Sequence, residues 1–195
     1  PGTIGGAIRM NAGAYGRELY DVIVSAEAVS SDGKRRVFGV SELGLGYREC
    51  SVPEGWIFVS ATLRGVIDLQ QSIEAQMAKV QAARKESQPI RSKTGGSTFA
   101  NPVEPGVGRS KAWELIDRAG CRGLQNGDAM VSNFHCNFLI NNGDASAADL
   151  EALGEEVQRR VAETTGVVLR WELQRFGNHF PGQVSRDIPK EGSAA

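Results

Sequence analysis

The chain has 195 residues, of which 41% are hydrophobic, and this is enough for one large domain or two small ones with a sizeable core. Its 22 basic and 23 acidic residues give a formal net charge of -1, so the overall charge does not indicate a nucleic-acid or membrane partner. No apolar run approaches the roughly 18 residues of a membrane helix, and three cysteines without metal-ligand spacing indicate reduced thiols in a cytoplasmic protein with no metal site.

The first sixteen residues, PGTIGGAIRMNAGAYG, are rich in glycine and predict a loop that enters a short helix. Backbone N–H groups at a helix start can hold a phosphate, and glycines let the main chain approach it closely. A tight packing turn explains the same glycines equally well. The stretch contains neither GxGxxG nor GxxxxGK[ST], so the sequence does not support a nucleotide-binding fold of those two kinds.

Three β-prone runs follow. Residues 21–30 and 34–39 are joined by Ser31-Asp32-Gly33, which predicts a β-hairpin. A helical turn is expected at residues 41–43, and residues 56–63 (WIFVSATL) predict a buried strand.

Three helices are expected in the rest of the chain. The first covers residues 67–85, and its methionine, Met77, is predicted to lie in a core-facing stripe. The second covers residues 110–119, with Ser110 as N-cap and Gly120 just past the end. The apolar stripe of the first helix, at residues 67–85, consists of Ile67, Ile73, Met77 and Val80.

The third helix begins at a capping box, Ser146 to Asp149. Short strands are expected around Val131 and residues 138–140, before this helix. After it, residues 167–176 (VVLRWELQRF) alternate as in a strand with one apolar face. The apolar positions of the third helix are Leu150, Leu153, Val157 and Val161.

Residues 95–102, GGSTFANP, place Ser97 in a glycine-rich turn whose backbone can approach a ligand closely. A hydroxyl there could donate or accept a proton, although an ordinary surface loop is written in the same way. Four cations precede the turn, and they indicate either a solvated loop or phosphate recognition. They are Arg84, Lys85, Arg91 and Lys93.

Three other side chains could take part in chemistry. Arg48 follows two glycines and an aromatic, and its alternative is a surface arginine paired with a carboxylate. Glu172 points away from the apolar face of its predicted strand, either into water or into a cleft. His135 stands between two phenylalanines, and we interpret it as a hydrogen-bonded core residue.

Five segments in order carry a family resemblance: PGTIGGAIRMNAGAYGRE, ELGLGYR, GGSTFANP, GCRGLQNGDAMVSNFHCNFLIN and LRWELQRFG. Over residues 1–177 the chain resembles the UDP-N-acetylenolpyruvoylglucosamine reductase (MurB) family of peptidoglycan precursor synthesis. The resemblance implies an α+β chain with a FAD-binding fold of the vanillyl-alcohol-oxidase (PCMH) type, which agrees with the missing GxGxxG.

The resemblance also implies a domain organisation. Residues 1–66 are expected to be the C-terminal part of the FAD-binding domain, residues 67–180 an α+β substrate-binding domain, and residues 181–195 a polar tail. The N-terminal part of the FAD-binding domain is expected upstream of Pro1, so a protein that starts at Pro1 is expected to bind FAD poorly.

The implied reaction uses NADPH to reduce FAD, and then a hydride from the flavin to reduce UDP-N-acetylglucosamine enolpyruvate to UDP-N-acetylmuramate. By the resemblance, Ser97 is the proton donor, while Arg48 and Glu172 stabilise the enolate. Tyr47 and Asn101 are implied to bind substrate, and the protein is expected to be a monomer. Main-chain amides around Gly2, Thr3, Gly5, Gly6 and Gly13 are implied to bind FAD.

The chain departs from the family pattern at several positions. Ala100 and Ser87 stand where relatives often have cations, so the four cations before Ser97 are candidates to hold the substrate diphosphate. Cys136 is given no role, and Arg170 replaces an acidic residue. The short interval between Arg48 and Ser97 indicates the compact form of the family. Two alternatives are another PCMH-type flavoprotein oxidoreductase and a non-catalytic nucleotide-sugar-binding module.

Overall fold

The computed structural model describes residues 2–103, 110–175 and 177. The chain divides into two compact units, residues 1–80 (unit 1) and residues 81–195 (unit 2), which we describe separately. The predicted boundary at residue 66 stays a prediction. Among the described residues, no helix is long and apolar enough to cross a membrane. The predicted tail, residues 181–195, and Phe176 lie outside the described residues.

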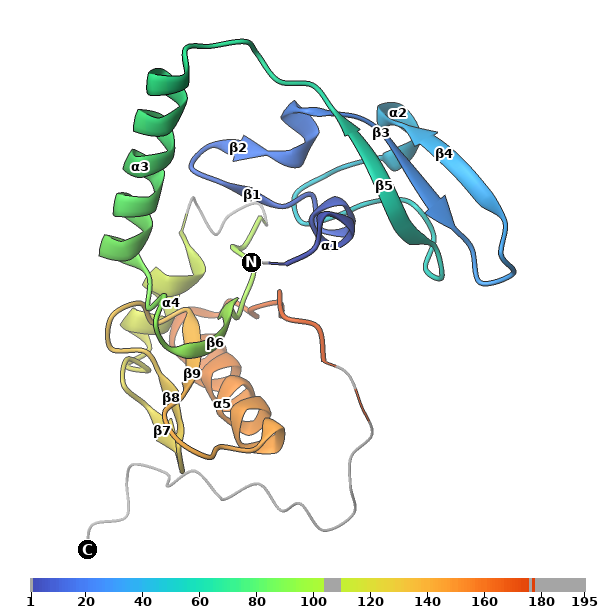
Figure 1. Ribbon diagram of the computed structural model, residues 1–195. Helices are drawn as coiled ribbons and strands as arrows, with labels where there is room; N and C mark the ends of the chain where they lie inside the picture. Colours follow the sequence, from blue (N-terminus) through green and yellow to red (C-terminus); the bar gives the residue numbers. More distant parts are fainter. Residues whose placement is uncertain (1, 104–109, 176, 178–195) are drawn as a thin grey trace, which may run out of the picture. The chain divides into compact units, whose positions relative to one another are not determined.

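Unit 1 is built on a three-stranded antiparallel sheet of order β4-β3-β5 (Figure 1). The central strand is β3 (Ile23–Val29), with β4 (Arg35–Gly39) on one side and β5 (Ile57–Leu63) on the other. The predicted hairpin is confirmed, because Val29 of β3 pairs with Arg35 of β4. The expected helical turn is α2 (Val40–Leu43).

The glycine-rich start of unit 1 forms the expected short helix, α1 (Ile4–Arg9), with Thr3 as N-cap. A two-stranded ribbon and one turn of 3-10 helix follow it before the main sheet. They are β1 (Gly13–Ala14), β2 (Arg17–Glu18) and Leu19–Asp21. The core of unit 1 contains Ile8, Ile23, Ala26, Ala28, Phe38, Leu43 and Val52.

The prediction that β5 is buried is wrong. Its Ile57 is 70% exposed and its Val59 is 51% exposed. The reason is its place in the sheet, since β5 is an edge strand that pairs only with β3 within the described residues. An apolar run indicates a strand, but it does not show whether another element covers that strand.

The helix expected at residues 67–85 is present as α3 (Gln70–Ser87), which crosses the division between the units. Its predicted core-facing stripe is wrong. No residue of α3 is buried, and Met77 is 57% exposed. Ile67 precedes the helix, and Ile73 and Val80 are each 43% exposed.

Unit 2 is built on a four-stranded antiparallel sheet of order β6-β9-β8-β7. The two strands predicted around Val131 and residues 138–140 are confirmed as neighbours in this sheet. The strands are β6 (Lys93–Ser97), β7 (Gln125–Asn126), β8 (Ala129–Val131) and β9 (Phe138–Asn141).

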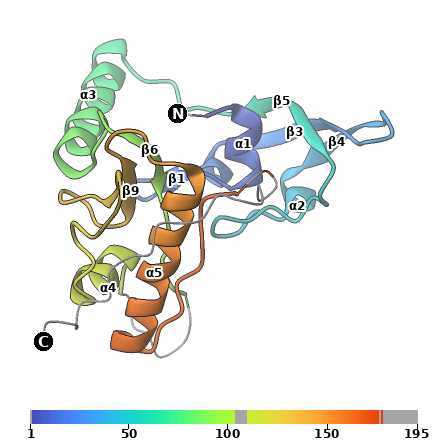
Figure 2. The same ribbon diagram turned by 90° about the horizontal axis from the view of Figure 1, so that it is seen from below.

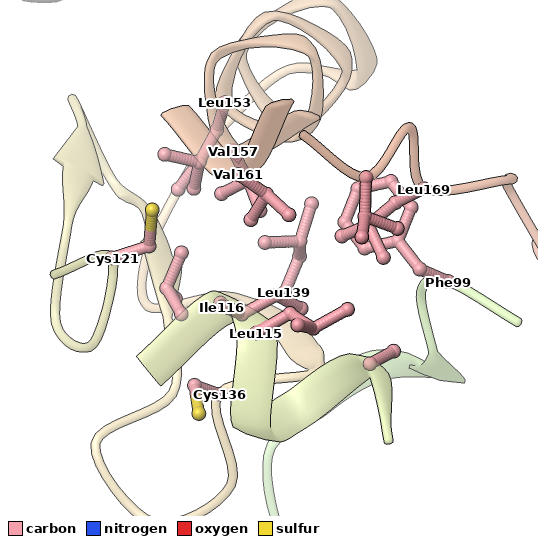
Figure 3. Close-up of a cluster of buried hydrophobic side chains, with 14 residues drawn as sticks. Phe99, Leu115, Ile116, Cys121, Cys136, Leu139, Leu153, Val157, Val161 and Leu169 are labelled. Carbon is pink, nitrogen blue, oxygen red and sulfur yellow. The ribbon is translucent and has the colours of Figure 1, made fainter. Parts of the chain in front are cut away.

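Helix α5 (Ala147–Thr165) packs on this sheet (Figure 2). The predicted capping box is confirmed, because Ser146 Oγ accepts a hydrogen bond from the Asp149 amide at 3.1 Å and Asp149 Oδ2 accepts one from the Ser146 amide at 2.9 Å. The apolar face of α5 meets α4 (Ala112–Arg118) in the core of unit 2 (Figure 3). That core includes Phe99, Leu115, Ile116, Val131, Leu139, Leu153, Val157, Val161 and Leu169.

Two details of unit 2 differ from the prediction. The N-cap of α4 is Lys111 and not Ser110, and the side chain that caps the Ala112 amide is that of Asn101. Val167 and Leu169 are buried and Val168 and Arg170 are exposed, as expected, but residues 171–173 are all half-buried, so the alternation ends there. Within residues 167–175 only Trp171 forms a β-bridge, with Phe99. This segment therefore lies beside Phe99 as an extended chain and not as a regular strand.

Candidate functional site

Ser97 is the last residue of β6 and lies at an interruption of the sheet. The ladder between β6 and β9 shifts register between Thr94 and Ser97, and Ser97 pairs with Phe138. Gly96 has a φ of +97°, a backbone conformation that favours glycine. The two glycines thus serve a local turn that leaves the Ser97 side chain half-buried at the end of the strand.

A backbone hydrogen bond joins Glu172 to the residue after Ser97. Its amide donates to the carbonyl of Thr98, the residue after Ser97, at 2.8 Å. Next to Glu172, the ring of Trp171 lies 4.9 Å from the ring of Phe99, and Trp171 Nε1 donates to Gln158 Oε1 at 3.0 Å. Unit 2 therefore brings two of the three predicted catalytic residues onto adjacent, hydrogen-bonded segments.

Asn101 has a structural task that its family role does not imply. Its side-chain Oδ1 accepts a hydrogen bond from the Ala112 amide at 3.0 Å, at the first residue of α4. Such a bond satisfies one of the N–H groups that a helix start leaves without a partner inside the helix. Asn101, two residues after the GGSTF segment, is therefore tied to the start of α4.

Arg48 belongs to unit 1, where it sits in a tight turn closed by hydrogen bonds between Gly46 and Glu49. It has a φ of +57°, which is uncommon for a residue with a side chain. Its Nη2 donates to the carbonyl of Gly13 at 3.0 Å, and its guanidinium lies 5.2 Å from the centre of the Tyr47 ring. Three predicted site residues, Arg48, Tyr47 and Gly13, thus meet.

The predicted cofactor glycines differ in why they are glycines. A Cβ on Gly5 would lie 3.1 Å from the Phe58 carbonyl oxygen, and a Cβ on Gly13 would lie 2.7 Å from the Arg17 carbonyl oxygen. Packing alone explains these two positions. At Gly2 no described residue other than its chain neighbours has an atom within 4 Å of such a Cβ, so packing in the described part of the chain does not explain that glycine. Thr3 Oγ1 accepts from the Gly6 amide at 3.0 Å and starts α1.

Asn11 is a positioning residue that the sequence reasoning missed. It is 1% exposed, its Nδ2 donates to the carbonyl of Gly46 at 2.9 Å and to Glu18 Oε2 at 2.8 Å, and its Oδ1 accepts from the Tyr20 amide at 3.0 Å. The side chain therefore fixes the turn that carries Arg48. Its φ of +40° is of a kind that asparagine tolerates, but the sequence alone does not reveal its partners.

His135 is a poor candidate for acid–base chemistry, as expected. Its ring lies 4.8 Å from that of Phe138, and its Nδ1 accepts from the Asn137 amide at 3.3 Å. Burial lowers the pKa of His135, which favours the neutral imidazole.

Among the described residues, the cysteines of unit 2 show no sign of reactivity or metal binding. Burial raises the pKa of the Cys121 thiol to about 11. No group of three or more metal-ligating side chains occurs in the described part of the chain.

Two cavities in unit 2 flank β6. The first, of about 600 Å³, is mainly apolar and lies between β6, the first turns of α5 and residues 171–175. The second, of about 370 Å³, lies just before β6 and is lined by Lys85 and Arg91 together with Gln88, Pro89, Ile90 and Ser92. The two cations of this second cavity form no ion pair within the described residues.

Two protein-family models match the chain. Residues 1–39 match the FAD binding domain, and residues 88–176 match the C-terminal domain of UDP-N-acetylenolpyruvoylglucosamine reductase. The expected α+β fold class is thereby confirmed.

Curated relatives extend the match. The chain is 58% identical over 177 residues to the UDP-N-acetylenolpyruvoylglucosamine reductase of Paramagnetospirillum magneticum, covering 91% of this chain and 56% of that protein. It is 55% identical over 182 residues to the reductase of the same name from Rhodospirillum rubrum, covering 93% of this chain and 57% of that protein. The chain thus spans somewhat more than half the length of these relatives.

A solved structure shows the same fold. The crystal structure of UDP-N-acetylenolpyruvylglucosamine reductase from Thermus caldophilus superposes with a TM-score of 0.74 at 39% identity, covering 88% of this chain and 59% of that one. The chain therefore belongs to the UDP-N-acetylenolpyruvoylglucosamine reductase (MurB) family.

Proposed function

We propose that the protein reduces UDP-N-acetylglucosamine enolpyruvate to UDP-N-acetylmuramate with FAD as cofactor and NADPH as reductant, as a cytoplasmic monomer. The family supports the reaction class, because the relatives with 51–58% identity carry the name of this reductase. The observation that carries the proposal is the bond between the Glu172 amide and the Thr98 carbonyl, at 2.8 Å, beside Ser97.

In this proposal the substrate's enol ether receives the hydride at one carbon, and Ser97 Oγ gives a proton to the neighbouring carbon. A serine hydroxyl is a weak acid, so it can act only on a strongly basic centre and from a fixed position. General acid catalysis of this kind contributes roughly 10²-fold to 10⁴-fold. Arg48 and Glu172 polarise the substrate carboxylate and stabilise the enolate, and such preorganised electrostatic stabilisation is often the larger effect.

The start of unit 1 fits a FAD site. Amides in the first turn of a helix have no partner inside the helix, and at α1 Thr3 Oγ1 takes up only that of Gly6. The open space at Gly2 allows a ligand to reach the main chain. We therefore assign Gly2, Thr3, Gly5, Gly6 and Gly13 to cofactor binding through their backbone. Bound FAD, once reduced by NADPH, would supply the hydride for the reaction.

We assign substrate binding to Tyr47 and Asn101, and diphosphate recognition to Lys85 and Arg91. Ser87 donates its hydroxyl to the Ala83 carbonyl at 2.7 Å, so it is turned back onto α3. Lys85 and Arg91 line the 370 Å³ cavity before β6 and have no acidic partner within the described residues. Replacing both with alanine is expected to raise the KM for the nucleotide sugar with little change in kcat.

The proposal is tested with the natural protein that contains this chain, loaded with FAD. NADPH should bleach the flavin absorbance, and addition of UDP-N-acetylglucosamine enolpyruvate should restore it while UDP-N-acetylmuramate appears by mass spectrometry. The Ser97→Ala variant should still be bleached by NADPH but should not turn over the substrate. Normal turnover by that variant would show that Ser97 is not the acid.

The same assay separates the alternatives. A flavin that NADPH bleaches but the enolpyruvyl substrate does not reoxidise would indicate another flavoprotein oxidoreductase of this fold. A colourless protein that binds UDP-sugars would indicate a nucleotide-sugar-binding module. Light scattering on the same sample tests the monomer.

A further inference from the structure

A buried asparagine is hydrogen-bonded to the segment that follows Ser97. Asn137 is 5% exposed, and its side chain forms two hydrogen bonds with the backbone of Phe99. Its Nδ2 donates to the Phe99 carbonyl at 2.8 Å, and its Oδ1 accepts from the Phe99 amide at 3.0 Å. One side chain thereby fixes both polar groups of the residue two positions after Ser97.

Thr98, between Ser97 and Phe99, is fixed on both sides. It is fully buried, its amide donates to the Asn137 carbonyl at 2.8 Å, and its Oγ1 accepts from the Leu139 amide at 3.2 Å. On the other side, its carbonyl accepts from the Glu172 amide. Thr98 therefore joins the β9 region to the segment that carries Glu172.

These bonds occur where the regular sheet is interrupted. The β6–β9 ladder shifts register just before Ser97, and β6 ends there. A buried backbone N–H or C=O that loses its ladder partner needs another one. The side-chain amide of Asn137 supplies partners for the Phe99 backbone, and the hydroxyl of Thr98 supplies one for the Leu139 amide.

We propose that Asn137 and Thr98 are positioning residues that set the distance between Ser97 and Glu172, an inference that rests on the proposed function. Neither side chain acts on the substrate. They act through the backbone, because Ser97 is covalently joined to Thr98 and Glu172 is hydrogen-bonded to it. Loss of either side chain frees the 97–100 segment to shift against residues 170–172, and a displacement of 1 Å can cost about 10²-fold in rate.

The test compares two half-reactions of the FAD-loaded natural protein in Thr98→Val, Thr98→Ser and Asn137→Ala. We expect Thr98→Val and Asn137→Ala to slow reoxidation of the reduced flavin by the enolpyruvyl substrate by about 10²-fold. Flavin reduction by NADPH and the KM for the substrate should change little. Thr98→Ser keeps the hydroxyl and should restore most of the rate.

Asn126→Ala is the matched control. Asn126 is 3% exposed and lies in the same unit, and its Nδ2 donates to the Asp149 carbonyl at 3.1 Å. This variant should lose stability but keep the substrate half-reaction. If Thr98→Val slows that step no more than Asn126→Ala does, or slows flavin reduction equally, the inference is wrong.

Amide hydrogen exchange distinguishes this failure from failure of the proposed function. In Thr98→Val the amides of Leu139 and Glu172 should exchange faster, and in Asn137→Ala that of Phe99, whereas Asn126→Ala should leave all three protected. A wild-type protein without substrate-dependent reoxidation would overturn the proposed function and the catalytic part of this inference together. Unchanged exchange in an active wild type and its variants would overturn the positioning alone.

Discussion

The two units hold their predicted site residues in different ways. In unit 1, Arg48 sits in a turn with a left-handed backbone, and its guanidinium donates a hydrogen bond to the Gly13 carbonyl. In unit 2, Ser97 and Glu172 are both joined to the fully buried Thr98, the first by the chain and the second by a hydrogen bond. The apolar core of unit 2 is also larger than that of unit 1. Most large apolar side chains that are exposed among the described residues belong to unit 1. Dense packing fixes the geometry of the residues that it surrounds.

This difference predicts that small changes in packing affect unit 2 more than unit 1, and the largest expected effect is at Gly154 in α5. A Cβ there would lie 2.0 Å from Cη2 of Trp171, the neighbour of Glu172. Alanine in a helix is favoured over glycine by about 1 kcal/mol, but overpacking costs about 1–3 kcal/mol and occasionally more. The clash should win, so Gly154→Ala should lower the free energy of unfolding, measured by urea denaturation.

Gly65 in unit 1 is the matched control for that variant. Among the described residues, none except its chain neighbours has an atom within 4 Å of a Cβ built on Gly65, and the φ of Gly65 is not in the left-handed region. Gly65→Ala should leave the unfolding midpoint nearly unchanged. Equal destabilisation by both variants would show that the two units do not differ in this respect.

The second prediction concerns acid sensitivity within unit 2. Hydrogen bonds from Arg159 and then Arg160 lower the pKa of Glu156 from 4.5 to about 2. Because the folded-state pKa is lowered, this stabilisation is present above pH 4.5 and is lost as the pH falls toward 2. We expect on the order of 1–2 kcal/mol, since solvent screens the half-exposed Arg159.

Thermal unfolding between pH 7 and pH 3 measures this effect. The Glu156→Gln variant should be less stable at pH 7 and should lose part of the dependence on acid. A variant that follows the wild-type curve at every pH would show that Glu156 does not contribute.

A smaller effect is expected at the start of unit 1. Thr3→Ala removes the hydroxyl that accepts from the Gly6 amide at 3.0 Å, and loss of an N-cap costs about 1 kcal/mol. Thr3→Ser should keep most of the stability. Denaturant unfolding of the two variants checks this, and equal midpoints would remove the capping role.

The smallest effect is on thiol reactivity, which reports on packing without a substitution. Burial raises the pKa of Cys121 to about 11, and Cys121 and Cys136 are 0% and 1% exposed. Cys50 in unit 1 is only half-buried. A thiol reagent at pH 8 should therefore label Cys50 first, and the other two only on unfolding. Rapid labelling of Cys121 in the native protein would contradict the tight packing of unit 2.

Local sequence signals predicted the elements well. The Asp-Gly turn predicted the β3–β4 hairpin, and the Ser146 capping box predicted the start of α5, because both depend on residues close together in the chain. The five ordered segments identified the family, and the site residues that they imply stay predictions. These successes needed no knowledge of what packs on what.

The tertiary structure decided which apolar surfaces are covered and how the site is held. The sequence could not show that β5 is an exposed edge, that α3 buries no residue, or that Asn101 caps α4. Hydrophobic periodicity shows which residues share a face, but burial needs a partner that the chain brings from elsewhere. The bonds of Asn137 and Glu172 to the segment after Ser97 join residues 38 and more positions apart, and only folding brings them together.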